Sequence, residues 1–255
     1  MKLIDTHTHL YIEDFDQDRD DQIELCIKNG VHKFFLPAID MSYTKRMLSL
    51  KAKYPKNIFL MSGLHPTHVK EDYKNELKHV EQNLKNGSFC AVGEIGIDLY
   101  WDKTNLSKQQ EAFNQQIIWA KEYDLPIVIH CRDAFDEVFD VLENHKSDKL
   151  RGIFHCFTGD LDQAQRAIGF NMKLGIGGVV TFKNGKIDKF IKEIPIESIV
   201  LETDSPYLAP VPYRGKRNES NYLPIIAKKV AECYDLPIEF IANKTSESAK
   251  LIFNC

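Results

Sequence analysis

The feature of this sequence that most restricts its fold is a repeated alternation of short apolar runs with longer amphipathic stretches. Several of the apolar runs are rich in β-branched residues and nearly uninterrupted, such as 127–129 and 199–201. Runs of this kind are typical of strands buried on both faces of a parallel sheet. The predicted strands, eight in all, cover residues 2–5, 33–36, 58–62, 89–93, 126–130, 152–155, 171–174 and 198–202.

Helical patterns lie between these runs. Residues 18–29, 73–84 and 107–123 each place apolar side chains on one stripe at helical spacing. Asn-Gly pairs at 29–30 and 86–87 stand where a helix ends with a glycine.

Eight strands that alternate with helices over about 250 residues predict an α/β fold, a (β/α)8 TIM barrel, formed as a single domain by residues 1–255. The alternative is a doubly wound open sheet. That fold favours a Gly-rich fingerprint after the first strand, where this chain has His7-Thr8-His9.

Composition narrows the class of protein. There are 33 basic and 37 acidic residues, a formal charge of −4, which excludes a basic coat for DNA. No apolar run approaches the roughly 18 residues of a membrane span, and the first residues do not resemble a signal peptide. The six cysteines show no C-x-x-C spacing, so we expect reduced thiols in a cytoplasmic protein. No feature of the sequence indicates an obligate protein partner.

Histidines and carboxylates gather at the predicted strand ends, which in a barrel of this kind form one face. His7 and His9 are two residues apart, so in extended chain both point to the same side. Nitrogen and carboxylate ligands suit Zn²⁺ or a similar divalent ion, and six ligands suit two ions that share a carboxylate. The candidate metal ligands are His7, His9, Glu94, His130, His155 and Asp204.

Each ligand also has a structural interpretation. A single histidine at a strand end is often a satisfied structural residue, and Glu94 could form a buried salt bridge. Asp204, which precedes Ser205-Pro206, could cap a turn. Together, however, several unpaired charges at one barrel mouth would cost several kcal/mol each, and a bound metal removes that cost.

The motifs around these ligands resemble those of the TatD family of metal-dependent hydrolases, over essentially the whole chain. The ten-residue motif at 201–210 is the most specific of them. The matching motifs are Asp5-Thr6-His7-Thr8-His9, Gly93-Glu94-Ile95-Gly96-Ile97-Asp98, His130-Cys131-Arg132-Asp133-Ala134, His155-Cys156-Phe157-Thr158-Gly159 and Leu201-Glu202-Thr203-Asp204-Ser205-Pro206-Tyr207-Leu208-Ala209-Pro210.

The resemblance implies a two-metal hydrolase whose better-known relatives are deoxyribonucleases that trim DNA from the 3′ end. His7, His9 and Asp204 would bind one ion, His130 and His155 the other, and Glu94 would bridge them. Zn²⁺, Mg²⁺ and Mn²⁺ all remain candidates. The reaction expected is hydrolysis of a phosphodiester by a metal-bound hydroxide, with Asp204 and Glu94 as the catalytic residues and Asp204 as general base.

Four residues are candidates for substrate binding: His65, Arg132, Arg214 and Lys216. Arginine suits phosphate because its planar fork binds two oxygens at once. Arg132 could instead pair with Asp133 or Asp136, and Lys216 could be a solvated loop charge. Trp101 and Tyr207 could stack on a base or pack in the core.

Two other functions remain open. The same metal site could hydrolyse a small amide or ester, or the ester of a D-aminoacyl-tRNA. The chain could also be a catalytically silent metal-binding scaffold, although a silent relative usually loses a ligand and here the predicted set is intact. The basic run from Arg214 to Arg217 favours a phosphorylated substrate.

Overall fold

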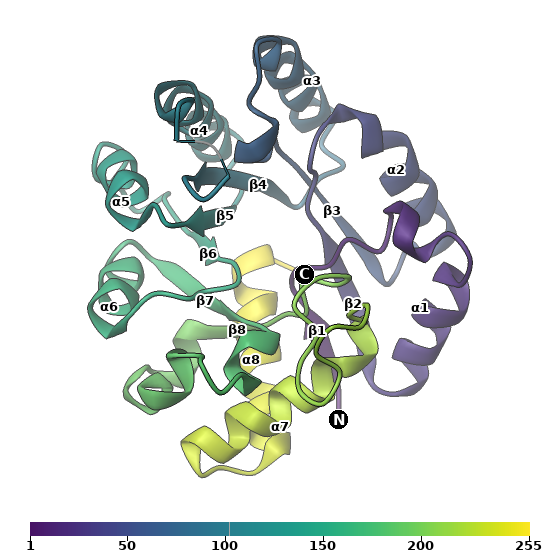
Figure 1. Cartoon of the computed structure of the whole chain (residues 1–255). Coiled ribbons are helices and arrows are strands. Elements are labelled where there is room, and N and C mark those ends of the chain that lie inside the picture. Colours follow the sequence, from purple (N-terminus) through teal and green to yellow (C-terminus); the bar gives the residue numbers. More distant parts are fainter. Residues whose placement is uncertain (102) are drawn as a thin grey trace.

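The computed structural model describes residues 1–101 and 103–255 and shows the strands arranged around one axis (Figure 1). The strands are β1 (Leu3–Asp5), β2 (Val31–Leu36), β3 (Ile58–Ser62), β4 (Ala91–Asp98), β5 (Ile127–Arg132), β6 (Gly152–Phe154), β7 (Met172–Ile176) and β8 (Ile199–Leu201).

All neighbouring strands are parallel and follow each other in sequence order from β1 to β8. The two ends of the sheet meet where the Thr6 N–H donates to Leu201 O at 3.1 Å and where Thr8 pairs with Ser205. The predicted (β/α)8 barrel is therefore confirmed, and an open doubly wound sheet is excluded.

The helices form the outer ring of the barrel (Figure 1). A helix follows each of the first six strands, whereas two helices follow the last. The helices are α1 (Arg19–Lys28), α2 (Thr44–Lys53), α3 (Tyr73–Lys85), α4 (Leu106–Glu122), α5 (Phe135–Glu143), α6 (Leu161–Gly169), α7 (Leu223–Tyr234) and α8 (Ile238–Phe253).

Local signals explain where several helices begin and end. The C-cap residues of α1 and α3 are Asn29 and Asn86, and the glycines that follow have positive φ angles of 98° and 70°. Both glycine helix ends predicted from the sequence are thus confirmed. α6 begins with a capping box in which Asp160 and Gln163 satisfy each other's backbone N–H groups.

The connection from β7 to β8 departs from the regular alternation. It consists of short 3-10 turns, including Gly178–Thr181, Ile187–Lys189 and Ile191–Glu193, where the regular repeat would place an α-helix. Ile187 and Ile191 are buried in these turns, so the segment still covers the barrel wall. No helical pattern was predicted for this segment.

The last helix closes one end of the barrel. Inward-facing side chains of seven strands, including Phe35, Met61 and Val128, form a core cluster with Ala249, Ile252 and Phe253 of α8. Phe253 stacks on Phe35 with 4.0 Å between ring centroids. Figure 1 shows α8 in yellow behind the strands. The carboxyl ends of the strands are therefore left as the open end of the barrel.

The outer cluster is larger and lies between the strands and the surrounding helices. None of the helices in the described part of the chain has the length and apolar character that a membrane crossing needs.

Candidate metal centre

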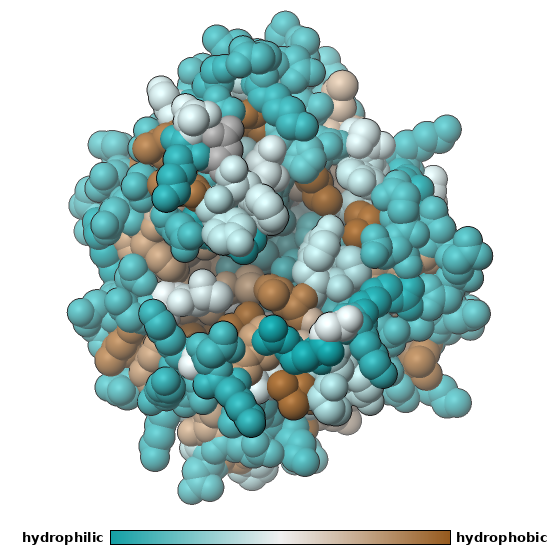
Figure 2. Space-filling view, in the orientation of Figure 1, coloured by the Kyte–Doolittle hydropathy of each residue, from teal (hydrophilic) through white to brown (hydrophobic). Residues whose placement is uncertain are grey.

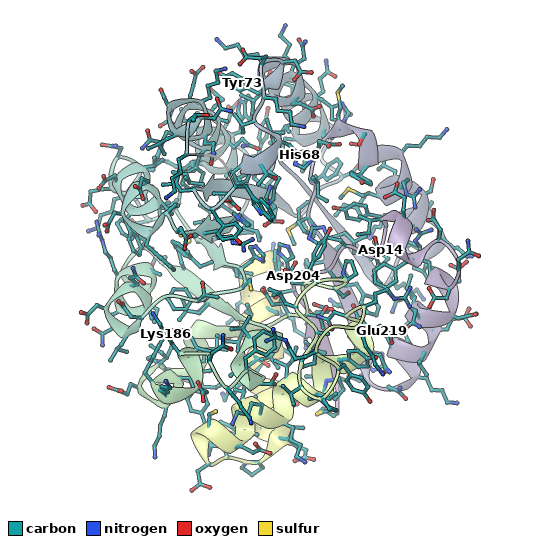
Figure 3. All side chains as sticks on the ribbon, in the orientation of Figure 1. Asp14, His68, Tyr73, Lys186, Asp204 and Glu219 are labelled. Carbon is teal, nitrogen blue, oxygen red and sulfur yellow. The ribbon has the colours of Figure 1, made fainter. Side chains whose placement is uncertain are left out.

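The open end of the barrel holds a cavity of about 660 Å³, and Figure 2 shows the hollow at the centre of this face. The predicted ligands lie in or just after five different strands. Asp204 lies in the middle of the face (Figure 3). Of these side chains, His7, His9, Glu94, His155 and Asp204 are buried, and His130 is partly buried. The fold thus brings all the predicted ligands together.

The Glu94 carboxylate lies at the centre of the cluster, and its two oxygens face different histidines. Oε1 lies 2.7 Å from His155 Nε2 and 2.9 Å from His130 Nδ1. Oε2 lies 3.2 Å from His7 Nε2 and 3.8 Å from His9 Nε2. A carboxylate placed in this way can serve two ions, one on each oxygen.

Asp204 lies on the Oε2 side of Glu94. Its Oδ1 is 3.4 Å from His9 Nε2 and 3.7 Å from His7 Nε2. Ligand atoms within 4.8 Å of one another form three groups that could hold an ion: His7 with His155 and Asp204, His7 with His9 and Glu94, and His65 with Glu94 and His130. His7 therefore takes part in two of these groups.

The residues present fit divalent metal ions. His7 is fully buried, and among the described residues neither of its ring nitrogens has a hydrogen-bond partner. A buried, unsatisfied imidazole is costly unless something else binds it. Imidazole nitrogens and carboxylate oxygens at these separations are the donor set of zinc and related ions.

Hydrogen bonds fix the orientation of His9. The Tyr11 hydroxyl donates to Pro37 O at 2.7 Å and lies 2.9 Å from His9 Nδ1. Since the hydroxyl has only one proton, His9 Nδ1–H must be the donor in that contact, which leaves the neutral ring's Nε2 free of a proton. That nitrogen is the one that faces Glu94 and Asp204.

Buried carboxylates lie beside the outer nitrogens of His130 and His155, with a hydrogen bond between Asp98 and His130 and a longer ion-pair contact between Glu202 and His155. His130 Nε2 lies 2.8 Å from Asp98 Oδ2, so its Nδ1 faces Glu94. His155 Nδ1 lies 3.5 Å from Glu202 Oε1, so its Nε2 faces Glu94. Carboxylates that hold the outer nitrogen of a ligating histidine are usual at metal sites.

Hydrogen bonds of the Asp5 side chain and of the backbone join the ends of β1 and β8. Asp5, which is fully buried, accepts hydrogen bonds from the N–H and the hydroxyl of Thr203. The Asp204 N–H donates to His7 O at 2.9 Å. Burial raises the pKa of Asp5 to about 7, even though these hydrogen bonds lower it.

Two glycines allow close packing around the metal site. Gly96 has a φ of 139°, and a Cβ there would lie 2.1 Å from His130 O on the paired strand. A Cβ on Gly175 would lie 2.2 Å from Glu202 Oε2. Glycine is needed at both positions, for the close pairing of β4 with β5 and for the buried Glu202 carboxylate.

Comparison with known proteins places this centre in a family. A sequence profile described as TatD related DNase matches residues 4–254. The chain belongs to the TatD-related DNase family. YabD of Bacillus subtilis strain 168, named an uncharacterized metal-dependent hydrolase, is 37% identical over 252 residues, which is 98% of each chain. The protein is accordingly a metal-dependent hydrolase of the TatD family.

Solved structures agree. The crystal structure of YjjV, described as a TatD homolog from Escherichia coli K12, has a TM-score of 0.94 at 30% identity and covers 99% of this chain and 98% of that one. The phosphotriesterase homology protein from Escherichia coli has a TM-score of 0.67 at 16% identity and shares the fold.

Charges in this TatD centre are strongly coupled. Burial opposes the charge of Glu94, yet the surrounding histidines, with His155 foremost, hold the pKa of Glu94 well below its usual range. Burial likewise opposes the charge of Asp204, but the neighbouring His9, His155 and His7 lower its pKa. Both carboxylates are therefore ionised at neutral pH.

The histidines separate into two classes. Burial opposes protonation of His155 and His130, but Glu94 and Glu202 raise the pKa of His155 well above 6.5, and Asp98 and Glu94 raise that of His130. In contrast, burial lowers the pKa of His7, and it lowers that of His65 to about 4.

The predicted substrate residues are divided between two places. His65 and Arg132 line the cavity, whereas Arg214 and Lys216 lie on an exposed loop away from its lining. His65 lies deeper than the mouth position expected of it, since its Nε2 is 3.3 Å from Glu94 Oε1. The Arg214 guanidinium lies 3.7 Å above the Phe182 ring.

The aromatic candidates line the cavity. Trp101 is 69% exposed and Tyr207 is 50% exposed, so neither packs in the core. Sequence reasoning did not identify Tyr11, Asp98 or Glu202 as residues that orient the ligands. Asp98 and Glu202 lie inside the matched motifs, close in sequence to the ligands Glu94 and Asp204. This closeness was the signal that could have identified them.

Proposed function

We propose that this protein is a two-metal hydrolase that cleaves phosphodiester bonds in DNA. The observation that carries the two-metal assignment is the placement of Glu94, whose Oε1 faces His130 and His155 and whose Oε2 faces His7 and His9. Asp204 completes the second set from the same side. The two histidine sets are those implied by the family resemblance.

Bound divalent ions would supply Lewis-acid activation of a water molecule and neutralise charge on phosphate oxygens. Asp204 is assigned as the proton acceptor, because its ionised carboxylate lies in the cavity beside the ligand nitrogens. Glu94 is assigned as the bridging ligand. His9 is held by Tyr11, and His130 by Asp98, so that ligand nitrogens are aimed before any ion arrives.

DNA is assigned as the substrate from the family and from the walls of the cavity. The family is described as TatD related DNase. The cavity lining includes a guanidinium at Arg132 and exposed aromatic rings at Trp101 and Tyr207. Proteins that bind single-stranded nucleic acid commonly stack its bases on aromatic side chains and bind its phosphates with arginines. The direction of attack, from the 3′ end, is carried over from the family.

A second candidate is hydrolysis of an amide or ester, including a D-aminoacyl-tRNA ester, because the same ions could polarise a carbonyl oxygen. A silent scaffold is disfavoured by the complete ligand set around Glu94. The exposed Arg214 and Lys216 do not line the cavity, so they favour neither candidate at the reacting bond.

The test uses single-stranded DNA labelled at either the 5′ or the 3′ end. Protein stripped of metal is assayed with added Zn²⁺, Mg²⁺ or Mn²⁺, alongside the Asp204→Asn variant. We expect stepwise release of nucleotides from the 3′ end only with an ion present, and strong loss of rate in the variant. Cleavage of an aminoacyl ester without digestion of DNA would refute the nuclease assignment.

The remaining assignments are proposed with the function. Residues 1–255 act as one hydrolase domain, since the first and last strands both contribute ligands. The six cysteines are all free of disulfides in the described chain, which supports a cytoplasmic location. We assign no obligate protein partner and no membrane attachment.

A further inference from the structure

The most exposed ring at the cavity belongs to a short turn that follows β4. Asp98, the last residue of β4, accepts hydrogen bonds at its Oδ1 from the backbone N–H groups of Tyr100 and Trp101, both at 3.0 Å. The two rings meet edge to face, with 5.0 Å between their centroids. The turn is therefore fixed to the carboxylate that also contacts the metal ligand His130.

Arg132 stands beside this turn. Its guanidinium carbon lies 3.8 Å from the centroid of the Tyr100 ring and 5.7 Å from that of Trp101. The face of the Arg132 guanidinium stacks on the Tyr100 ring. Within residues 1–101 and 103–255, no carboxylate forms a salt bridge with this guanidinium. The alternative ion pairs with Asp133 and Asp136 are thus not formed, and the N–H edge of Arg132 stays available to a ligand.

The position of Arg132 places this group next to the reacting centre. Arg132 is two residues beyond His130 on β5, which is about 7 Å along an extended strand. Arg132 and Trp101 line the same cavity as Glu94 and His130. A ligand seated between the histidines would therefore extend toward the indole and the guanidinium.

We infer that Trp101 and Arg132, supported by Tyr100, form a subsite for the nucleotide next to the scissile phosphate. The base of that nucleotide stacks on the exposed indole of Trp101, and its phosphate binds the guanidinium of Arg132. This inference rests on the proposed nuclease function and adds to it the residues that bind the substrate beyond the reacting bond.

Binding can be measured without turnover. In a metal chelator, a short single-stranded oligonucleotide is titrated while tryptophan fluorescence is recorded. Trp119, the second tryptophan of the chain, is 8% exposed on α4, so quenching reports on Trp101. We expect strong quenching in the native chain, little in Trp101→Phe, and binding about 10- to 100-fold weaker in Trp101→Ala.

The two contacts can be separated by salt and by base removal. Arg132→Ala should reduce the slope of log K against log salt by about 0.7, as expected for one phosphate of a single strand. Trp101→Ala should leave that slope unchanged. An abasic unit next to the scissile bond should weaken binding to the native chain but not to Trp101→Ala. Equal losses in both proteins would overturn the stacking assignment.

Hydrolysis then tests the link to function. Bis(p-nitrophenyl) phosphate carries no neighbouring nucleotide, so in both variants kcat/KM for the oligonucleotide should fall at least tenfold more than kcat/KM for this small diester. Phe240→Ala, on the exposed side of α8, is the matched control and should change neither rate. Unchanged kcat/KM for the oligonucleotide in both variants refutes the subsite and leaves the proposed function standing. No hydrolysis of either substrate by the native chain with any ion refutes the proposed function and the subsite with it.

Discussion

Replacing Asp98 by asparagine tests how a carboxylate that contacts a metal-binding histidine, here His130, controls metal affinity. Asp98 Oδ1 accepts two backbone N–H groups, and Oδ2 lies 2.8 Å from His130 Nε2. Asparagine has one acceptor oxygen. If that oxygen keeps the backbone contacts, the side-chain NH2 faces His130 Nε2 and favours the tautomer with its proton on Nδ1. That nitrogen is the one directed at Glu94, so the proton competes with an ion.

The expected loss of metal affinity is about 10- to 100-fold, which corresponds to about 1.4–2.7 kcal/mol. The assay is competition for Zn²⁺ between the protein and a chromophoric chelator at fixed pH. Asp133→Asn is the matched control, because Asp133 is exposed and its φ of 54° is tolerated by asparagine. Trp101 fluorescence reports whether the turn has kept its place. Native affinity in Asp98→Asn, with the turn intact, would refute this account of His130.

Three further predictions follow from the same contacts. Asp204→Asn should keep the fold by circular dichroism yet lose about 10²- to 10⁴-fold in kcat, and a fully active variant would remove Asp204 as proton acceptor. Metal affinity should rise with pH through and above 6.5, because the raised pKa values of His155 and His130 leave protons on these rings that an ion must displace. Calorimetry in buffers of different ionisation enthalpy should detect the release of these protons when metal binds. Metal binding without proton release would contradict the assignment. Phe253→Ala should lower the free energy of unfolding, measured in urea, by about 3 kcal/mol, because Phe253 is buried against Phe35. The control Leu251→Ala, at a position that is 78% exposed, should change this free energy by less than about 0.5 kcal/mol. Equal effects of the two substitutions would contradict closure of the barrel by α8.

Much of the fold could be predicted because the strands of a barrel carry a strong local signal. Runs such as 127–129 have no polar interruption, and the helix ends at Asn29 and Asn86 rest on single Asn-Gly pairs. The connection between β7 and β8 could not be predicted, since its 3-10 turns are held by burial of Ile187 and Ile191 against the barrel. The closure by α8 depends on contacts between Phe253 and Phe35 that are far apart in the sequence.

The clustering of the proposed ligands could be predicted for a similar reason, because each lies at the end of or just after a predicted strand, although β4 and β5 extend past Glu94 and His130. The residues that orient them were not predicted. Asp98 and Glu202 act through the outer nitrogens of His130 and His155, and only the three-dimensional distances show this. Charge alone was also a poor guide to substrate contacts, since Lys216 lies on an exposed loop outside the cavity while Arg132 lines it.

The most direct test of the central claim is a metal titration of the stripped protein during hydrolysis of 3′-labelled single-stranded DNA. Two ions share Glu94 in our account, so the rate should rise with added ion and reach its plateau at two equivalents per chain. The Asp204→Asn chain should give no such rise in rate. Full hydrolysis with no ion, or a plateau after a single equivalent, would contradict a two-metal centre built on Glu94.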